Sequence, residues 1–360
     1  MSKIPYKITG FNHCEFYVSN AKQSAYYFNN ALGFETIAYK GLETGHRNQV
    51  SYVVNQGKIN FILTSPLNHN TKISEHLLKH GDGIKDVAFT VDSSEIAWKT
   101  SVDRGAKSVS NPMKISDKFG EAIISSVKTF GDTVHTFVER ENYSGPFLPG
   151  FSPKNSDKSS QPIGLVHIDH VVGNQPENNM IEICEFYENI FGWHRFWTID
   201  DEDITTEFSS LRSVVMANDN ETIKIPINEP APGLKKSQIQ EFIDYYGSAG
   251  IQHIALSTKN IIQTVKIMRE NGVEFLETPS TYYKDLSNRV GDIDEDINTL
   301  SELGILADRD ENGYMLQIFT SPIQDRPTLF LEIIQRKGSN SFGKGNFKAL
   351  FESIEKEQEK

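Results

Sequence analysis

A pattern that occurs four times constrains the fold of this chain more than any other feature of its sequence. Its first two copies, residues 10–39 and 166–197, each predict a strand, a turn, an amphipathic helix and an aromatic strand. A histidine stands in the middle of each first strand, at His13 and at His170. The two halves of the chain therefore begin with the same unit, which indicates an internal duplication.

The other two copies follow in the same order. Residues 83–107 and 250–273 each predict a short apolar strand and an amphipathic helix that ends near a glycine. The apolar strand within 133–143 matches the one within 328–338. Each unit is therefore a βα pair followed by further strands. Four such units predict an α+β fold with two curved sheets, each wrapped around its own interior.

The two halves are joined by a segment with the composition of a linker. Residues 144–162 are rich in Pro, Gly, Ser and Lys and show no periodicity. We predict an N-terminal domain over 1–145, a linker over 146–162 and a C-terminal domain over 163–360.

Two segments of the second half depart from the repeat. Residues 279–312 are rich in Asp, Glu and Asn, and they predict an insertion that is partly helical. The tail over 345–358 predicts a single helix with one narrow apolar stripe. The stripe consists of Phe347, Leu350, Phe351 and Ile354.

Charge and cysteine content exclude several classes of protein. The 360 residues carry a formal net charge of −12, which argues against nucleic acid or an anionic membrane as the main partner. Two cysteines, Cys14 and Cys184, are too few for a disulfide framework, and both lie in patterns typical of buried residues. No apolar run approaches the length of a membrane span, and the first residues lack the apolar core of a secretion signal. We expect a reduced, cytoplasmic protein.

Three strands of the second half carry side chains that can bind a metal. His170, His253 and Glu332 each stand on a strand-like apolar run. Two imidazoles and one carboxylate form the facial set of non-haem Fe(II) oxygenases, which leaves three positions open for substrate and O₂. Strand alternation favours His170 over His167, because only His170 matches His13 and it shares a face with Ile168 and Val172.

Glu332 is flanked by apolar residues, so its carboxylate is costly to bury unless it is paired or bound to a metal. A salt bridge with Arg336 or Arg326 is the structural alternative to a metal.

The first half offers a different set at the matching positions. These positions hold His13, Asp86 and Glu139, one imidazole fewer and one carboxylate more than the second half. We interpret this set as a degenerate copy without a working metal.

Long motifs of the second half resemble the 4-hydroxyphenylpyruvate dioxygenase family of the vicinal-oxygen-chelate superfamily. They are HIDHVVGN, LRSVVMAN, IPINEPAPGLKKSQIQEFIDYYGSAGIQHIAL, VEFLETPSTYY, MLQIFTSPIQDRPTLFLEIIQR and FGKGNFKALFESIE. The resemblance extends over nearly the whole chain. It implies two vicinal-oxygen-chelate-type open barrels built from four βαβββ modules, with a C-terminal lid helix over 345–358. This expectation agrees with the repeat.

The resemblance also implies an activity. The family converts 4-hydroxyphenylpyruvate and O₂ to homogentisate and CO₂ in the breakdown of tyrosine and phenylalanine. It uses one Fe(II) per chain, which His170, His253 and Glu332 would bind here. The substrate carries its own 2-oxo acid and can chelate the metal with it. The resemblance further implies a homodimer or homotetramer.

The family's pocket residues map onto matching motifs of this chain. The resemblance assigns catalytic roles to Ser213, Asn228, Gln252 and Phe347. Neutral amides and a hydroxyl orient a substrate without competing for the metal, and aromatic faces sandwich a phenol ring. The complete substrate-binding set implied by the resemblance is Ser213, Asn228, Gln238, Gln252, Gln317, Phe319, Phe330, Phe342, Asn346 and Phe347.

Three alternatives share this fold. The nearest is 4-hydroxymandelate synthase, which acts on the same substrate but hydroxylates the benzylic carbon. Asn228 and Phe319 stand in their dioxygenase-like state and favour homogentisate. A non-catalytic binding module of the same fold would lack the metal set. A zinc or nickel isomerase would need a ligand set richer in glutamate.

Overall fold

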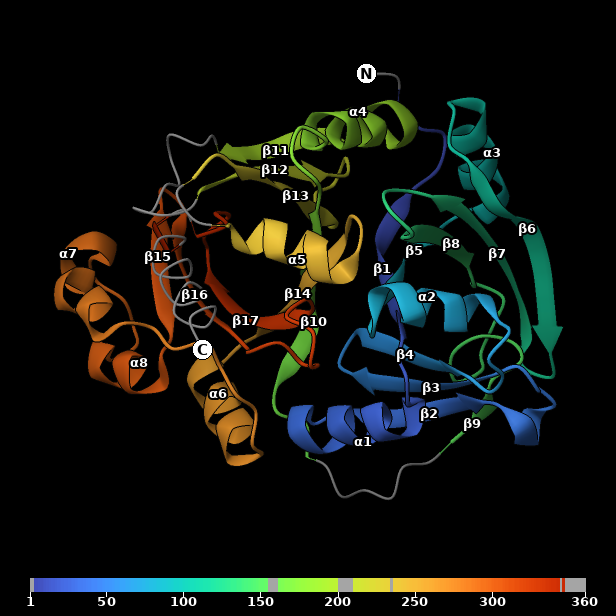
Figure 1. Cartoon of the computed structure of the whole chain (residues 1–360), viewed down its shortest axis with the longest axis horizontal. Helices are drawn as coiled ribbons and strands as arrows, with labels where there is room; N and C mark the ends of the chain where they lie inside the picture. The colour runs from blue at the N-terminus through green and yellow to red at the C-terminus, as the bar shows by residue number, and fades with distance from the viewer. Residues whose placement is uncertain (1–2, 155–160, 200–209, 234–235, 344, 347–360) are drawn as a thin grey trace.

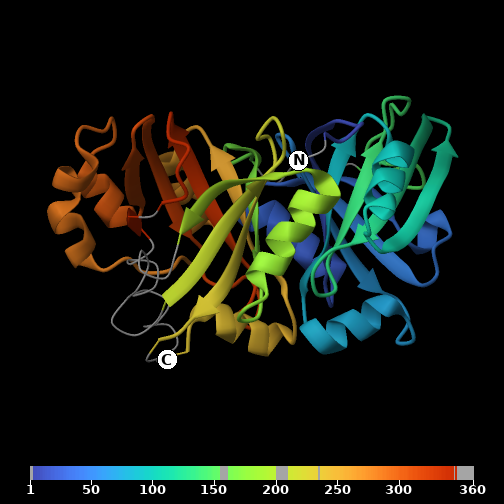
Figure 2. The ribbon, with the colours of Figure 1, turned by 90° about the horizontal axis from the view of Figure 1, so that it is seen from above.

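The structure is a computed structural model that describes residues 3–154, 161–199, 210–233, 236–343 and 345–346. Its described part forms two strongly curved sheets that lie side by side, one from each half of the chain (Figures 1 and 2). Strand order in the first sheet is β6-β7-β8-β5-β1-β4-β3-β2-β9, and in the second it is β11-β12-β13-β10-β14-β17-β16-β15.

The first sheet comprises β1 (Ile8–Tyr17), β2 (Glu35–Lys40), β3 (Gln49–Gln56), β4 (Ile59–Pro66), β5 (Gly83–Val91), β6 (Ser108–Asp117), β7 (Gly120–Lys128), β8 (Val134–Glu139) and β9 (Ser152–Pro153). The second comprises β10 (Leu165–Asn174), β11 (His194–Ile199), β12 (Ser210–Ala217), β13 (Lys224–Ala231), β14 (Gly250–Thr258), β15 (Leu306–Asp310), β16 (Gly313–Phe319) and β17 (Phe330–Lys337). The α-helices are α1 (Ala21–Leu32), α2 (Lys72–His80), α3 (Ser94–Asp103), α4 (Met180–Phe191), α5 (Gln238–Tyr246), α6 (Ile261–Glu270), α7 (Leu286–Val290) and α8 (Ile297–Leu303). The 3₁₀ helices are η1 (Leu42–Thr44) and η2 (Ser280–Asp285).

The four predicted βαβββ modules are present. They are β1-α1-β2-β3-β4, β5-α3-β6-β7-β8, β10-α4-β11-β12-β13 and β14-α6-β15-β16-β17. In every module the last strand pairs in parallel with the first. Within each half, the two first strands pair antiparallel, β1 with β5 and β10 with β14. Helices α2 and α5 connect the modules of each half and contact each other where the halves meet (Figure 1).

The repeated helices also end in the same way. Gly33 and Gly192 both adopt a left-handed backbone with φ near +66°, at 67° and 66°, and close the C-termini of α1 and α4. Each is followed by a fully buried aromatic side chain, Phe34 or Trp193. The sequence similarity of the two halves therefore reflects shared turns as well as a shared apolar pattern.

Repeated β-bulges change the alternation of side chains on β10. In its pairing with β14, Ile168 opposes Leu256 while His170 opposes Ala255, so Asp169 is an extra residue without a partner. Ile168 therefore packs in the core with Leu256, and the prediction that it shares a face with His170 is wrong. The choice of His170 over His167 agrees with the structure, because His167 is exposed and bonds to Ser257.

Part of the predicted linker packs with the first half. Phe147 and Leu148 are buried against the first sheet, and β9 pairs with β2 at its edge. The described chain therefore stays with the first sheet up to about Lys154, although the division into domains remains a prediction.

Residues 279–312 are partly helical as predicted, since they contain η2, α7 and α8. Both Cys14 and Cys184 are buried and free, as expected.

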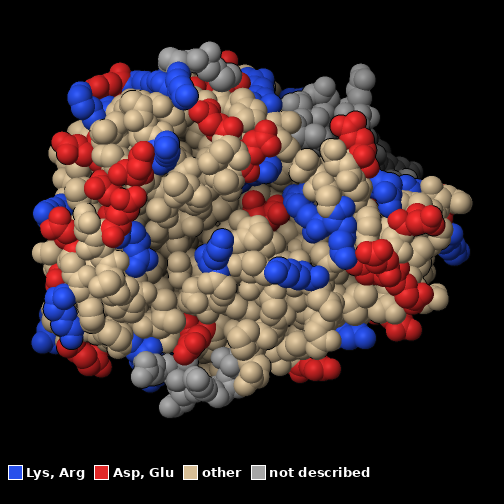
Figure 3. Space-filling view, turned by 180° about the vertical axis from the view of Figure 1, so that it is seen from behind, with Lys and Arg blue, Asp and Glu red and all other residues tan. Residues whose placement is uncertain are grey.

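Basic and acidic side chains intermingle over the face shown in Figure 3. No helix of the described residues is both long and apolar enough to cross a bilayer.

Candidate metal centre

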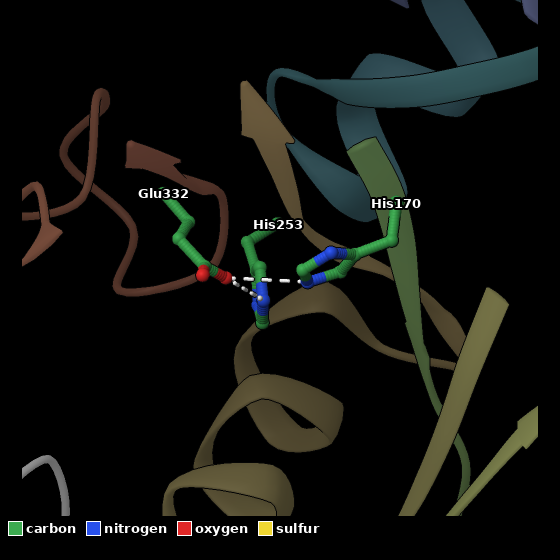
Figure 4. A group of neighbouring side chains, drawn as sticks. All are labelled: His170, His253 and Glu332. Atoms are coloured by element: carbon green, nitrogen blue, oxygen red, sulfur yellow. Dashed lines mark ion pairs between the residues drawn. The ribbon is translucent and has the colours of Figure 1, made fainter. Parts of the chain in front are cut away.

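Three strands of the second sheet bring the predicted metal ligands together. Nε2 of His170 on β10 lies 3.2 Å from Oε2 of Glu332 on β17, and Nε2 of His253 on β14 lies 3.4 Å from the same oxygen (Figure 4). One ligand atom from each side chain lies within 4.8 Å of the others, and all three residues are buried. It is the one such group of at least three His, Cys, Asp or Glu side chains found within the described ranges.

A small residue allows the ligands to meet. Ala255 on the central strand pairs with His170 on one side and with Glu332 on the other. Paired residues on neighbouring strands point to the same face of a sheet. His170 and Glu332 therefore extend over the methyl group of Ala255, while His253 reaches the same point from two residues away on β14.

The residue before each histidine orients its ring. Nδ1 of His170 lies 2.8 Å from Oδ1 of Asp169, and Nδ1 of His253 lies 3.1 Å from Oε1 of Gln252. Both partners are oxygens that accept a proton, so Nδ1 carries hydrogen in each ring. The two Nε2 atoms lie on the side of Glu332, so they are the nitrogens that can bind a cation once they have lost their protons.

Electrostatic shifts match this arrangement. Burial opposes ionisation of Glu332, but the two imidazoles outweigh it and lower the pKa of the carboxyl to about 2. Burial likewise favours the neutral ring of His170, but the carboxylates of Glu332 and Asp169 raise the pKa above its ordinary value. The site therefore favours an ionised Glu332 carboxylate, and a metal cation that binds there would replace the protons on Nε2 of the histidines.

Glu332 forms neither of the two alternative salt bridges. Arg336 bonds to Asp169 instead, and Arg326 donates to the backbone carbonyls of Lys79 and Tyr245.

The predicted substrate residues divide between two hollows. Ser213, Asn228, Gln317, Phe319 and Phe342 line a cavity of about 40 Å³ together with the three metal-ligand candidates. Gln238, Gln252 and Phe330 line a neighbouring hollow of about 320 Å³.

Phe330 lines the larger, outer hollow and stacks on His253, which lines the smaller, inner cavity, with the ring centroids 4.7 Å apart. Oε1 of Gln317 is buried in the inner cavity without a hydrogen-bond partner in the described residues.

The two remaining predicted residues belong to the tail. Asn346 is buried, and its Oδ1 accepts a hydrogen bond of 2.6 Å from the hydroxyl of Tyr282 in the insertion. Phe347 and the predicted lid helix beyond it lie outside the described residues.

Two polar side chains near the centre were missed from the sequence. Asp169 holds the ring of His170, and its bulged position hides it from simple strand alternation. Asn174 pairs with Asn228, which in turn pairs with Ser213, so the three point to one face. Asn174 is fully buried and its amide has no hydrogen-bond partner in the described residues. Its spacing of four residues from His170 was the signal that could have identified it.

The first half differs from its predicted ligand set. His253 opposes Phe330 and Ala255 opposes Glu332, whereas Asp86 opposes Val134 in the first sheet. The residue equivalent to Glu332 is therefore Thr136, and the assignment of Glu139 to this position is wrong. Glu139 instead accepts a 2.9 Å hydrogen bond from the backbone N–H of Ser94.

Comparisons with known proteins agree with this geometry. Residues 3–146 match the family model "Hydroxyphenylpyruvate dioxygenase, HPPD, N-terminal", and residues 167–318 match the "Glyoxalase/Bleomycin resistance protein/Dioxygenase superfamily". A variant of 4-hydroxymandelate synthase from Streptomyces coelicolor has a similar structure, with a TM-score of 0.86 and 28% identity over 98% of this chain and 99% of that one.

Two curated relatives are more similar in sequence. The chain is 51% identical to 4-hydroxyphenylpyruvate dioxygenase of Xenopus tropicalis, over 98% of this chain and 92% of the relative. It is 48% identical to the enzyme of the same name from Coccidioides posadasii, over 97% of this chain and 93% of the relative. The chain belongs to the 4-hydroxyphenylpyruvate dioxygenase family.

Proposed function

We propose that this protein converts 4-hydroxyphenylpyruvate and O₂ to homogentisate and CO₂ in the breakdown of tyrosine and phenylalanine. The reaction comprises oxidative decarboxylation, ring hydroxylation and migration of the side chain. The observation that carries the proposal is the convergence of His170, His253 and Glu332 beside a cavity, in a chain about half identical to enzymes of that name.

The donor set fits one Fe(II) per chain. Two neutral imidazoles and one carboxylate on one side are the ligands that non-haem Fe(II) oxygenases use. Bound there, Fe(II) would supply a Lewis acid for the 2-oxo acid of the substrate and a site for O₂. The protein's own contribution is to hold the three side chains in place before metal and substrate arrive.

The pocket residues orient the substrate. Ser213 on β12, Asn228 on β13 and Gln317 on β16 offer a hydroxyl and two amides to the inner cavity. The unpartnered oxygen of Gln317 is costly to bury, by about 1–3 kcal/mol, so a ligand hydroxyl that donates to it would be favoured. Phe319 and Phe342 bound the same cavity and provide apolar surface for the ring.

Gln238 and Gln252 act at the outer hollow. Nε2 of Gln252 lies 3.4 Å from Oε1 of Gln238, so the two amides support each other. Because Gln252 also holds Nδ1 of His253, a substrate bound by this amide would be placed relative to the metal ligand.

The tail completes the proposal. We propose that Asn346 and Phe347 help to bind the substrate and that the helix over 345–358 covers the pocket and excludes water. Truncation before Gly345 is expected to abolish coupled turnover, whereas full activity of the truncated chain would refute the lid.

We further propose that the protein is a cytoplasmic homodimer or homotetramer. Light scattering would test its oligomeric state, and cell fractionation would test its location.

One measurement tests the activity. Protein loaded with Fe(II) is mixed with 4-hydroxyphenylpyruvate, O₂ uptake is recorded, and the product is identified by retention time and mass. Homogentisate formed in proportion to O₂ and CO₂ supports the proposal. 4-Hydroxymandelate as the main product would instead assign the chain to the synthase reaction, and no uptake by iron-loaded protein would mean that the pocket is built for another ligand.

A further inference from the structure

We propose that Asp169 and Arg336 form a positioning pair that fixes the metal-binding orientation of His170 and links it to residues 339–342. The inference rests on the proposed metal site, but it does not depend on which product the enzyme forms. Neither residue lines the cavity beside the candidate ligands, and Asp169 contacts His170 at Nδ1, so both would act through His170.

The largely buried carboxylate of Asp169 contacts both His170 and Arg336. Its Oδ1 accepts the Nδ1 hydrogen of His170 at 2.8 Å. The guanidinium of Arg336 approaches the same carboxylate with two nitrogens, Nε to Oδ2 and Nη2 to Oδ1, each at 2.8 Å. A two-point bond between two planar groups fixes the plane of the carboxylate as well as its position. The imidazole that bonds to that plane is therefore held in one rotation.

The other edge of the Arg336 guanidinium binds the backbone of residues 339–341, which precede the C-terminal tail. Its Nη1 donates to the carbonyls of Ser341 at 2.7 Å and Ser339 at 3.3 Å. Its guanidinium lies over the ring of Phe342, 5.3 Å from the centroid.

Phe342 contacts His170 as well as Arg336, because its ring packs edge-on against the imidazole with the centroids 5.0 Å apart. His170 is therefore held from two sides, by Asp169 through a hydrogen bond and by Phe342 through packing. Arg336 contacts both of these partners.

The same segment has an independent anchor. One carboxylate oxygen of Asp310 accepts hydrogen bonds from the backbone N–H groups of Asn340 and Ser341 and from the hydroxyl of Ser339. Since Asp310 already holds this turn, Arg336 is not needed merely to keep residues 339–341 folded. The two-point bond from Arg336 to Asp169 therefore has a role other than folding this turn.

The first half provides an internal control for this reasoning. His13 follows the same kind of bulge, and its Nδ1 lies 2.8 Å from Oδ1 of Asn12. An amide stands there in place of the carboxylate. Arg140, which corresponds to Arg336, points to the carbonyl of Gly145 and lies over Tyr143. The charged pair thus occurs beside the histidine that belongs to a ligand set, and not beside the one that does not.

Charge explains the difference. A carboxylate that accepts the Nδ1 hydrogen raises the basicity of the opposite nitrogen and strengthens its bond to a metal, whereas an amide does so much less. A carboxylate buried there needs a compensating cation, which Arg336 supplies.

The test replaces Asp169 by the residue of the first half. In the Asp169→Asn variant of the full-length protein, affinity for Co(II) is measured by competition with a chromophoric chelator, and the visible spectrum of the Co(II) form is recorded. We expect metal binding to weaken by about 10- to 100-fold and the ligand-field bands to shift. Asp103→Asn is the matched control, because Asp103 forms an exposed ion pair with Lys99 far from the site and should leave both readouts unchanged.

A second variant keeps the proposal falsifiable if Asp169→Asn folds poorly. Arg336→Lys keeps the charge but loses the two-point geometry, and it should weaken Co(II) binding in the same direction. Combining the two substitutions should cost less than the sum of their separate effects, because both act through one pair. Wild-type Co(II) affinity and spectrum in a folded Asp169→Asn or Arg336→Lys protein would overturn the proposal, as would strictly additive effects.

Discussion

The two halves of this molecule have the same scaffold and differ at a few side chains. Both are pairs of βαβββ modules with parallel first and last strands, the same bulge before the central histidine, and the same alanine opposite it, Ala88 or Ala255. The metal-binding set differs at two of its three positions, where Asp86 replaces His253 and Thr136 replaces Glu332. The fold therefore does not depend on the metal site, and the site depends on very few residues.

The first half fills the same space with internal hydrogen bonds. Asp86 accepts a hydrogen bond of 3.1 Å from the backbone N–H of Thr136 and another from its hydroxyl. His13 packs edge-on against Phe147, and burial lowers the pKa of its imidazole to about 3. A neutral histidine among satisfied partners has no need of a cation. At positions equivalent to two of the candidate ligands, the polar groups of the first half therefore have hydrogen-bond partners within the protein.

The largest expected effect comes from truncating Glu332 and comparing the result with truncation of its counterpart in the first half. Glu332→Ala removes the carboxylate of the metal set and should abolish Fe(II) retention and lower kcat by at least about 1,000-fold, since a metal-dependent reaction has lost its metal. Its counterpart, Thr136→Ala, should leave metal content at one per chain. Metal analysis after gel filtration and O₂ uptake measure both. Loss of metal from Thr136→Ala would show that the first half contributes a site.

The next effect concerns pH, because Asp86 is a buried carboxyl group in the first half. Burial raises the pKa of Asp86 to about 7, and although the hydrogen bond from Thr136 opposes this, the neighbouring Glu15 adds to it. Between pH 4 and 7 the folded state then keeps a proton that the unfolded state has lost. Stability contributed by this group should therefore fall as pH rises through that window, by about 4 kcal/mol at most.

Asp86→Asn removes this titration. Denaturant unfolding at pH 5 and pH 8 should show the variant gaining on the wild type as pH rises, with metal content unchanged. An equal difference in stability at the two pH values would mean that Asp86 is already ionised in the folded protein.

A third prediction uses the paired alanines. Ala255→Val places two methyl groups between His170 and Glu332 and should push them apart, which would weaken Co(II) affinity by about 10- to 100-fold for a packing cost of about 1–3 kcal/mol. Ala88→Val occupies the same place in the first half and should reduce only the free energy of unfolding. Equal metal affinity in the two variants would show that Ala255 does not set the spacing of the ligands.

The sequence was sufficient to predict the modules and the ligand set, and the reasons are physical. Apolar periodicity and repeated helix-ending glycines are local signals, so the βαβββ units could be found without knowing how they pair. The ligands could be found because His170, His253 and Glu332 interrupt apolar strands, where polar groups are costly. The predicted pocket residues all came from resemblance to a family and not from spacing.

What the sequence could not predict depends on strand register. Bulges at Asp169 and Gln252 shift the alternation of side chains, and they arise from pairing with a distant strand. For this reason simple alternation places Ile168 on the wrong face. The equivalent of Glu332 is likewise fixed by the pairing of β5 with β8 and of β14 with β17, which selects Thr136 and not Glu139. The bond between Asp169 and Arg336 joins residues 167 positions apart, which no local pattern reveals.

The smallest expected effect tests this corrected register. Glu139 accepts the N–H of Ser94 at the start of α3 at 2.9 Å, and Gln335 accepts the N–H of Ile261 at the start of α6 at 2.7 Å. The two residues occupy equivalent places, so an amide oxygen is enough to satisfy a helix N-terminus in this fold. Glu139→Gln should therefore keep the hydrogen bond and lose only the attraction between a carboxylate and the positive end of the helix, about 0.3–1 kcal/mol.

Denaturant unfolding at low and high salt measures this loss, which should shrink as salt screens the charge. Metal content should stay the same. A change in metal content without a change in stability would instead return Glu139 to the ligand role that its alignment with Glu332 suggested. The outcome thus decides whether the register of β8 or the alignment of the sequences describes the relation between the two halves.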